Sequence, residues 1–307
     1  MFQIAFHSVL TTLLYILPGF IVAKMKKVAP THLPGLSGLL VYACSPCLVF
    51  STLQELDFSF QNLGNMFYAF LLTLFLQGAF MAILYLVLRS RYHDAKYRIL
   101  TVGSAIGNVG FFGLPIIRAI LPDHPEVSSY AVMFMMSMNI YVFTMVIFCL
   151  TENVRYMTLR QAVVNPSSLA FIVGIVFFCL KPLFAPPALF LSACTTIGGL
   201  TTPLCMLILG IRLANMDFKR LFTNAFVYLV AGGKLLLFPL FCFLVLHLLP
   251  VPETMRMTLF ILSGTPCAAV LLSMAEMVDA EQELAANCLL VSTLLCCFTI
   301  PLLALCI

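Results

Sequence analysis

Charged side chains are scarce in this chain of 307 residues. They make up 9% of the residues, whereas 62% are hydrophobic, and the mean hydropathy is +1.09. A soluble domain carries about 25% charged residues, and far fewer cannot cover a surface that faces water. The scarcity excludes a soluble globular protein and indicates a fold whose outer surface faces lipid. The sixteen basic residues form no run dense enough to follow a phosphate backbone, which excludes a nucleic-acid partner.

Motifs for ATP-driven transport or for catalysis are also absent from the sequence. No P-loop and no G-x-G-x-x-G occur, which excludes an ordinary ATP-driven pump. An intramembrane enzyme would need an HExxH motif, a Ser–His pair or paired carboxylates within the apolar segments, and the sequence offers none. We therefore predict no metal site, no cofactor and no enzymatic activity. The twelve cysteines lie mostly in apolar runs and are expected to be free thiols.

Long apolar runs are what the sequence has in abundance. A helix needs about 20 apolar residues to cross a bilayer. Because the connections are short, the sequence predicts an all-α polytopic membrane protein with partner lipids and little structure outside the bilayer. The ten predicted spans are 3–23, 34–54, 63–88, 98–121, 127–150, 165–184, 187–213, 223–249, 255–277 and 283–306.

The distribution of basic residues favours one orientation. The even-numbered loops and the adjoining span ends carry three basic residues (Arg118, Lys181 and Arg256), Lys234 lies within a span, and the odd-numbered loops carry twelve. Because loops rich in Lys and Arg stay in the cytoplasm, both termini are predicted to lie outside a cell membrane. The twelve are Lys24, Lys26, Lys27, Arg89, Arg91, Lys96, Arg98, Arg155, Arg160, Arg212, Lys219 and Arg220.

Similar features recur 157–160 residues apart. Ser45-Pro46 interrupts span 2 and Thr202-Pro203 interrupts span 7, while Asn108 in span 4 corresponds to Pro266 in span 9. Since each half has five spans, residues 1–155 and 156–307 would form two repeats of opposite orientation. Inverted repeats with paired interruptions are typical of secondary transporters. The other matched pairs are Lys24 with Lys181, Asp57 with Asp217, and Arg98 with Arg256.

Spans 4 and 9 contain the strongest helix-breaking sequences. The stretch from Gly103 to Pro115 holds four glycines and Asn108, and span 9 contains Ser263-Gly-Thr-Pro266. Small-residue packing and proline kinks are alternative explanations. The matched positions favour two broken helices that cross at mid-membrane. Their second halves, expected to begin near Pro115 and Ala268, would direct two positive N-termini at one point that attracts anions.

These interruptions also carry a family resemblance. The segment Asn108-Val-Gly-Phe-Phe-Gly113-Leu-Pro115 resembles the Asn-x-x-x-x-Gly-x-Pro stretch of the auxin efflux carrier family, which includes plant PIN carriers and bacterial malate and malonate permeases. Thr202-Pro203-Leu204 with Gly210, and the run from Ala275-Glu276 to Pro301, fit the same pattern. The resemblance covers the whole chain, and the short central loop is similar to that of the bacterial members.

The resemblance implies an architecture and a division of labour. It implies ten helices in two inverted five-helix repeats with broken, crossing helices 4 and 9, as in sodium–proton antiporters and bile acid transporters. It also implies a homodimer, a scaffold of spans 1, 2, 6 and 7, and a mobile transport domain of spans 3–5 and 8–10. In family members the crossover amide contacts a carboxylate substrate, which assigns that role to Asn108. Thr265-Pro266-Cys267 has no amide, so the substrate's identity does not carry over.

Polar residues within the spans complete the predicted site. Lys234 lies about 15 Å deep in span 8 and is expected to bind a substrate carboxylate, to replace a coupling cation, or to tether span 4 or 9. Asn139 would line the cavity or form a bond between helices. Ser45 and Thr202 could bond backbone groups freed by the following prolines. The predicted substrate-binding residues are Ser45, Gly107, Asn108, Gly110, Pro115, Asn139, Thr202, Lys234, Thr265 and Pro266.

The sequence thus predicts a secondary carrier of small organic anions such as malate, malonate or auxin-like carboxylates. Elevator-type alternating access around the crossover would move the substrate. A passive channel or a receptor-like sensor with the same fold is the alternative, and saturable flux with counterflow would distinguish a carrier from it. Glu276 at the inner end of span 9 is expected to face the loop rather than to carry protons.

Overall fold

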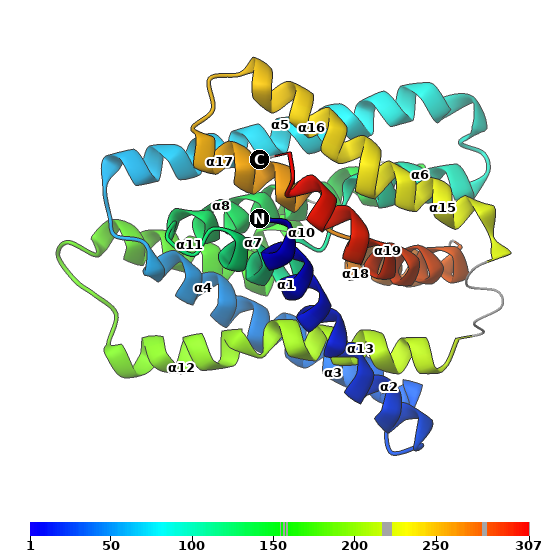
Figure 1. Cartoon of the computed structure of the whole chain (residues 1–307), viewed down its shortest axis with the longest axis horizontal. Helices are drawn as coiled ribbons and strands as arrows, with labels where there is room; N and C mark the ends of the chain where they lie inside the picture. Colours follow the sequence, from blue (N-terminus) through cyan, green and yellow to red (C-terminus); the bar gives the residue numbers. More distant parts are fainter. Residues whose placement is uncertain (154, 156, 158, 217–222, 278–280, 307) are drawn as a thin grey trace.

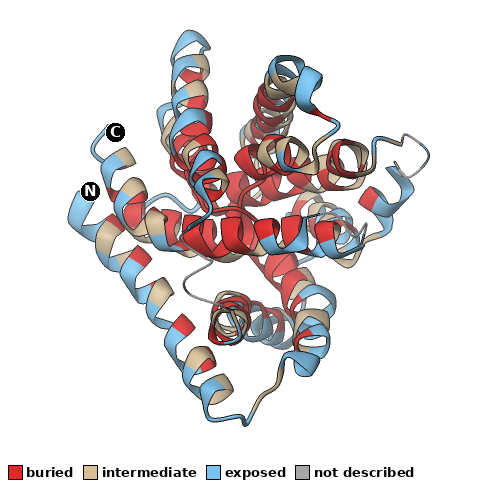
Figure 2. Ribbon diagram, turned by 90° about the vertical axis from the view of Figure 1, so that its right-hand side faces the viewer, coloured by how far each residue is buried: buried red, intermediate tan, exposed pale blue. Residues whose placement is uncertain are grey.

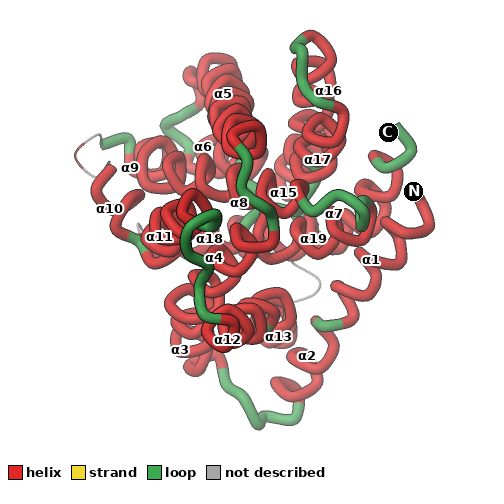
Figure 3. Tube along the Cα trace, turned by 90° about the vertical axis from the view of Figure 1, so that its left-hand side faces the viewer, coloured by secondary structure: helices red, strands yellow, loops and turns green. Residues whose placement is uncertain are grey.

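The computed structural model describes residues 1–153, 155, 157, 159–216, 223–277 and 281–306. Asp217, Lys219 and Arg220, which entered the repeat and orientation arguments, lie outside the described residues. Within the described part the chain is helical throughout and contains no strand, only one isolated bridge between two extended segments (Figure 3). The predicted all-α class is confirmed for these residues.

The helices follow one another with short connections. The first half of the chain contains α1 (Phe2–Leu14), α2 (Ile16–Lys24), η1 (Pro30–His32), α3 (Leu33–Leu39), η2 (Leu40–Cys44), α4 (Ser45–Glu55), α5 (Phe60–Leu88), η3 (Arg89–Arg91), α6 (Ala95–Ala105), η4 (Val109–Gly113), α7 (Leu114–Ile120), α8 (Glu126–Tyr141), η5 (Val142–Val146) and α9 (Ile147–Thr151). The second half contains α10 (Leu159–Val164), α11 (Pro166–Leu180), α12 (Ala188–Gly199), α13 (Thr201–Ala214), α15 (Ala225–Gly232), η7 (Gly233–Leu237), α16 (Phe238–Leu248), α17 (Glu253–Ser263), α18 (Ala269–Met277) and α19 (Gln282–Leu303).

Among the described residues, seven helical segments are long and apolar enough to cross a membrane. The other predicted spans differ: 165–184 contains the shorter helix Pro166–Leu180, and 98–121 and 255–277 are each interrupted. In Figure 1 the connection from α4 to α5 and the loop from α11 to α12 lie at the left end, and the turn from α5 to α6 lies at the right end. The seven segments are Phe2–Lys24, Pro30–Glu55, Phe60–Arg91, Glu126–Thr151, Ala188–Ala214, Ala225–Leu248 and Gln282–Leu303.

Three prolines inside the spans follow π-helical turns. η2, η4 and η7 each end two residues before a proline, at Pro46, Pro115 and Pro239 respectively. Proline has no N–H to donate to the carbonyl four residues earlier, and a π turn is the wider arrangement that accommodates such a local disruption. The interruption predicted at Ser45-Pro46 is therefore a widened turn and not a break, because the helix continues from η2 into α4. At the matched position in span 7, α12 and α13 meet at Leu200, before Pro203.

Glycines allow one group of helices to pack very closely. A side chain at Gly210 of α13 would collide with the backbone of α2 at Ile16, and one at Gly198 of α12 would meet the backbone of α4 at Leu48. Such close approach of backbones is characteristic of membrane helices, where small residues take the place of a hydrophobic driving force. Figure 3 shows α2, α3, α12 and α13 together below the rest of the bundle.

The buried residues gather where the remaining helices cross. Figure 2 shows them at the centre of the molecule, with exposed positions along the outer helices. Many exposed side chains are large and apolar, such as Phe67, Leu189 and Leu240. A lipid-facing surface accounts for them without any further partner. All twelve cysteines are free thiols, as predicted.

Candidate substrate site at the helix crossover

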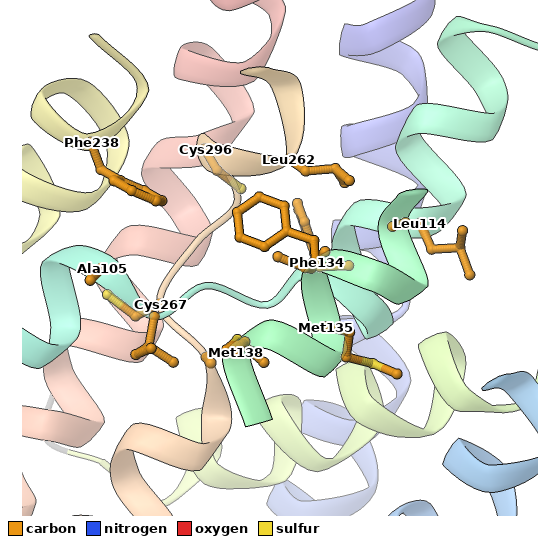
Figure 4. Packing of buried hydrophobic residues seen from close by; sticks show 14 of the residues in the cluster. Ala105, Leu114, Phe134, Met135, Met138, Phe238, Leu262, Cys267 and Cys296 are labelled. Atoms are coloured by element: carbon orange, nitrogen blue, oxygen red, sulfur yellow. The ribbon is translucent and has the colours of Figure 1, made fainter. Parts of the chain in front are cut away.

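Two interrupted helices pass each other in extended conformation inside the molecule. α6 ends at Ala105 and α17 ends at Ser263, and the helical backbone resumes after a short extended stretch in each case. Gly107 and Cys267 form an isolated antiparallel bridge between the two stretches. Figure 4 shows the extended segments crossing beside Cys267. The interruptions predicted in spans 4 and 9 are therefore present, and they meet each other.

Backbone hydrogen bonds hold the crossover together. Asn108 N donates to Pro266 O at 2.8 Å, and Ala268 N donates to Ile106 O at 3.2 Å. Each stretch thus satisfies polar groups of the other, which buried backbone requires where neither helix nor water does so. Cys267 N donates to the Ser292 hydroxyl at 3.0 Å, which ties the crossover to α19.

The second half of the first broken helix begins earlier than predicted. It starts at Val109, directly after Asn108, and runs through η4 and α7 to Ile120. The prediction that it begins near Pro115 is wrong, because the π turn of η4 lets the helix continue into the proline. In the other broken helix, α18 starts at Ala269, next to the predicted Ala268.

Gly107 is required by the tight packing behind the crossover. A Cβ atom at this position would lie 2.6 Å from Thr265 Oγ1 and 2.7 Å from Lys234 Cε, and real contacts are not so short. A glycine here therefore leaves room for the side chains of Thr265 and Lys234 against the first extended stretch. The Thr265 hydroxyl is itself occupied, because it donates to Leu262 O at 2.7 Å.

Lys234 supports the crossover from within the protein. Its side chain is fully buried, its Nζ donates to Ser263 O at the end of α17, and it lies 4.8 Å from the Phe238 ring centroid. The last carbonyls of a helix lack intrahelical donors and form its negative end, which an ammonium stabilises. Of the predicted alternatives, this geometry is that of the tether to span 9.

A cavity of about 310 Å³ lies on the other side of the crossover. It contains five of the predicted site residues, and the first residues of both second half-helices, Val109 and Ala269, line it as well. Its volume is at the lower end of the range of about 300–1,000 Å³ for small-molecule sites. The five residues are Ser45, Gly107, Asn108, Gly110 and Asn139.

The other five predicted residues lie elsewhere. Pro115 and Thr202 line a second cavity of about 780 Å³, which also includes Arg118. Thr265, Pro266 and Lys234 do not line the 310 Å³ cavity. The structure therefore brings together half of the predicted set and separates the rest into a supporting layer and a second cavity.

Ser45 and Thr202 do not bond backbone groups as predicted. The Ser45 hydroxyl bonds the Ser167 hydroxyl at 2.8 Å and so connects α4 to α11. Among the described residues no hydrogen bond of the Thr202 side chain is found, and its neighbour Thr201 donates to Gly198 O. The π turn before Pro46 and the helix junction at Leu200 have already accommodated the prolines.

Sequence reasoning missed several polar residues of the cavity wall. The most important is Arg212, which lies inside the predicted span 187–213 but was counted with the cytoplasmic loops; in the structure it belongs to α13 and lines the cavity. A helical stripe could have revealed it, because Cys205, Leu209 and Arg212 follow one another at spacings of four and three residues and all line the cavity. The other missed polar residues of the wall are Ser37, Asn165, Ser167 and Ser273.

Glu276 also lies differently from the prediction. Arg212 Nη1 donates to Glu276 Oε1 at 3.1 Å, so the carboxylate faces α13 rather than only the loop. Arg212 lines the cavity and Glu276 lines a smaller adjoining hollow of about 270 Å³, which Arg212 shares.

Comparison with known proteins identifies the family of the chain. The model of a family described as membrane transport proteins matches residues 4–158 and 150–304, nearly the whole chain. The chain belongs to this family. The resemblance to auxin efflux carriers inferred from Asn108 to Pro115 is thereby confirmed. A relative from Methanothermobacter thermautotrophicus, described as an uncharacterized transporter, is 26% identical over 303 residues and covers 96% of each chain.

Family membership and the seven apolar helices identify a multi-pass membrane transporter. Membership of a transporter family also favours transport over catalysis. The cavity beside the crossover is accordingly a candidate for the place where the transported molecule binds.

Proposed function

We propose that this transporter is a secondary carrier of small organic anions, such as malate, malonate or auxin-like carboxylates. The observation that carries the proposal is the position of the 310 Å³ cavity, which Asn108 and the first residues of two half-helices line together. Helix N-termini present free N–H groups and a partial positive charge, which favour a bound carboxylate. The Asn108 amide adds a neutral donor beside them.

The chemistry of the cavity wall favours an anion over a cation. The described residues that line it include one basic side chain, Arg212, and no Asp or Glu. Most of the remaining wall is apolar and includes Met135, Phe111 and Val142. Such a wall suits the carbon skeleton of an organic acid, while the few polar groups orient its carboxylate.

We also propose that transport follows an elevator-type motion. In this arrangement ten spans form two inverted repeats, residues 1–155 and 156–307, and spans 1, 2, 6 and 7 form the scaffold. The close packing of α2 with α13 and of α4 with α12 supports a rigid scaffold. The cavity lies between this group and the crossover, since Ser45 and Arg212 line it from one side and Asn108 and Asn139 from the other. A homodimer in the cell membrane, with both termini outside, completes the proposal.

Uptake into proteoliposomes tests this function. The purified protein would be reconstituted and supplied with labelled mono- and dicarboxylates, with and without imposed proton, sodium and voltage gradients. We expect saturable uptake of at least one carboxylate and faster uptake when the same acid is present inside, because a carrier exchanges bound substrate. Flux that rises linearly with concentration and shows no counterflow would instead indicate the channel alternative.

A further inference from the structure

Two ion pairs occupy matched positions in the two halves of the chain. Glu55 at the end of α4 pairs with Arg118 of α7, and Arg212 near the end of α13 pairs with Glu276 of α18. Glu55 and Arg212 are 157 residues apart, and Arg118 and Glu276 are 158 apart, the offsets of the proposed repeat. Figure 1 places the ends of α4 and α13 at opposite ends of the bundle.

Several hydrogen bonds hold the Glu55–Arg118 pair. Arg118 Nη2 lies 2.8 Å from both oxygens of Glu55 and 3.2 Å from the Thr52 hydroxyl, and Arg118 Nε donates to Ser128 at 2.8 Å. These bonds connect α7 and α8 to α4. Several simultaneous bonds of this kind fix a guanidinium in place.

The Arg212–Glu276 pair is much looser. One hydrogen bond of 3.1 Å joins them, and within the described part of the chain Arg212 has no other hydrogen-bond partner. The two pairs are similarly exposed, since the side chains of Glu276 and Arg212 are 43% and 23% exposed and those of Glu55 and Arg118 are both 38% exposed. The difference between them lies in the number of hydrogen bonds. A pair with a single contact that is partly open to solvent contributes little stability. Arg212 and Glu276 can therefore separate at little cost in free energy.

Arg212 also differs from Arg118 in what surrounds it. Arg212 lines the same cavity as Asn108, and it is the basic residue among the described residues of that wall. A guanidinium is suited to a carboxylate because its planar fork can donate two parallel hydrogen bonds. Glu276 supplies a carboxylate from the protein itself, so Arg212 keeps a partner of the same chemical class.

We propose that Arg212 binds the carboxylate of the incoming substrate in exchange for Glu276. The inference rests on the proposed function and names the residue that first receives the anion. Exchanging one carboxylate for another keeps the charge of Arg212 compensated throughout, so this half-buried guanidinium is never left unpaired. Glu276 then acts as a competitor for the site. The matched Arg118–Glu55 pair, in which Arg118 already bonds Glu55, Thr52 and Ser128, acts as a structural contact.

If Arg212 binds the substrate and Glu276 competes with it, neutralising Arg212 and neutralising Glu276 should change the affinity for the acid in opposite directions. Dissociation constants for malonate, malate and indole-3-acetate would be measured on purified protein from ligand-dependent thermal stabilisation. Arg212→Gln should weaken binding of the acid roughly ten- to a hundredfold, since it removes a charged hydrogen bond. Glu276→Gln should strengthen binding several-fold, because it removes the competitor. Arg212→Lys keeps the charge but loses the fork, and we expect an intermediate constant.

The Arg118–Glu55 pair provides the matched control. Arg118→Gln and Glu55→Gln each break the same structural contact, so they should change binding in the same direction. If Arg212→Gln and Glu276→Gln also weaken binding together, their pair is structural and the inference is overturned while the proposed function stands. If the wild-type protein binds none of the acids, the proposed function fails and the inference fails with it.

Discussion

Replacing Asn108 by aspartate places a negative charge where the substrate carboxylate is proposed to bind. The exchange preserves the shape of the side chain, which is 7% exposed. Asn108 precedes the first residue of η4, and its backbone N–H bonds Pro266 O whatever the side chain. The Asn108 side chain makes no cap hydrogen bond to η4, so aspartate removes no helix cap. The variant is therefore expected to insert and fold.

The effect on binding follows from electrostatic repulsion. Two like charges about 4 Å apart at an effective dielectric constant near 20 repel by roughly 4 kcal/mol, or about a thousandfold in affinity. Asn108→Ala removes only a hydrogen-bond donor, which costs roughly 1–3 kcal/mol. The bond lost within the protein is weak, since Asn108 Nδ2 lies 3.9 Å from Cys205 Sγ. The expected order of affinity is wild type, then Ala, then Asp.

Dissociation constants from ligand-dependent thermal stabilisation measure this order. Asn224→Asp is the matched control, because Asn224 caps α15 through an oxygen that aspartate retains, accepting from Phe226 N at 3.0 Å. Asn224 does not line the cavity, so this variant should bind like the wild type. Equal affinities for the wild type, Asn108→Ala and Asn108→Asp would refute the placement of the anion beside Asn108.

Other substitutions test the supporting structure. Lys234→Met keeps the volume but leaves Ser263 O without its donor, so the free energy of unfolding should fall by about 1–3 kcal/mol, seen as a lower melting temperature in detergent. Gly107→Ala should lower the melting temperature too, since its methyl group meets Lys234; an unchanged value for either variant would contradict the packing described. The hydrogen bond and charge of Lys181 hold the pKa of the Asp57 carboxyl below its usual value. The stabilisation by the Asp57–Lys181 pair is present above about pH 4 and is lost as the pH falls. The melting temperatures of the wild type and of Asp57→Asn should therefore differ at pH 6 and converge in acid.

The sequence was most informative about where helices break. Gly107-Asn108 and Thr265-Pro266 combine residues that weaken a helix with matched positions in the two halves, and both segments are extended in the structure. The sequence was less informative about how a helix restarts. Pro115 marked the wrong residue because a π turn accommodates proline, and the residue pattern around it is the same for a π turn and for a break.

The composition of the site depended on tertiary packing that periodicity does not reveal. Asn108, Asn139 and Ser45 line the cavity, as expected for polar residues inside spans, which have few other locations. Lys234 is equally polar and equally deep, yet it lies behind the crossover, where Ser263 O accepts its hydrogen bond. Arg212 was missed because it lies near the end of a span, where basic residues normally face the cytoplasm.

A single cysteine at Ser273 offers the most direct test of the central claim, that organic anions bind in the cavity beside Asn108. Ser273 lines this cavity and is exposed. In Ser273→Cys made in a chain without its native cysteines, the rate of alkylation by a small neutral reagent would be measured with and without a transported carboxylate. We predict saturable protection by the carboxylate, and no protection in a chain that keeps only the exposed Cys306. An alkylation rate in Ser273→Cys that is unchanged at saturating carboxylate would contradict the account.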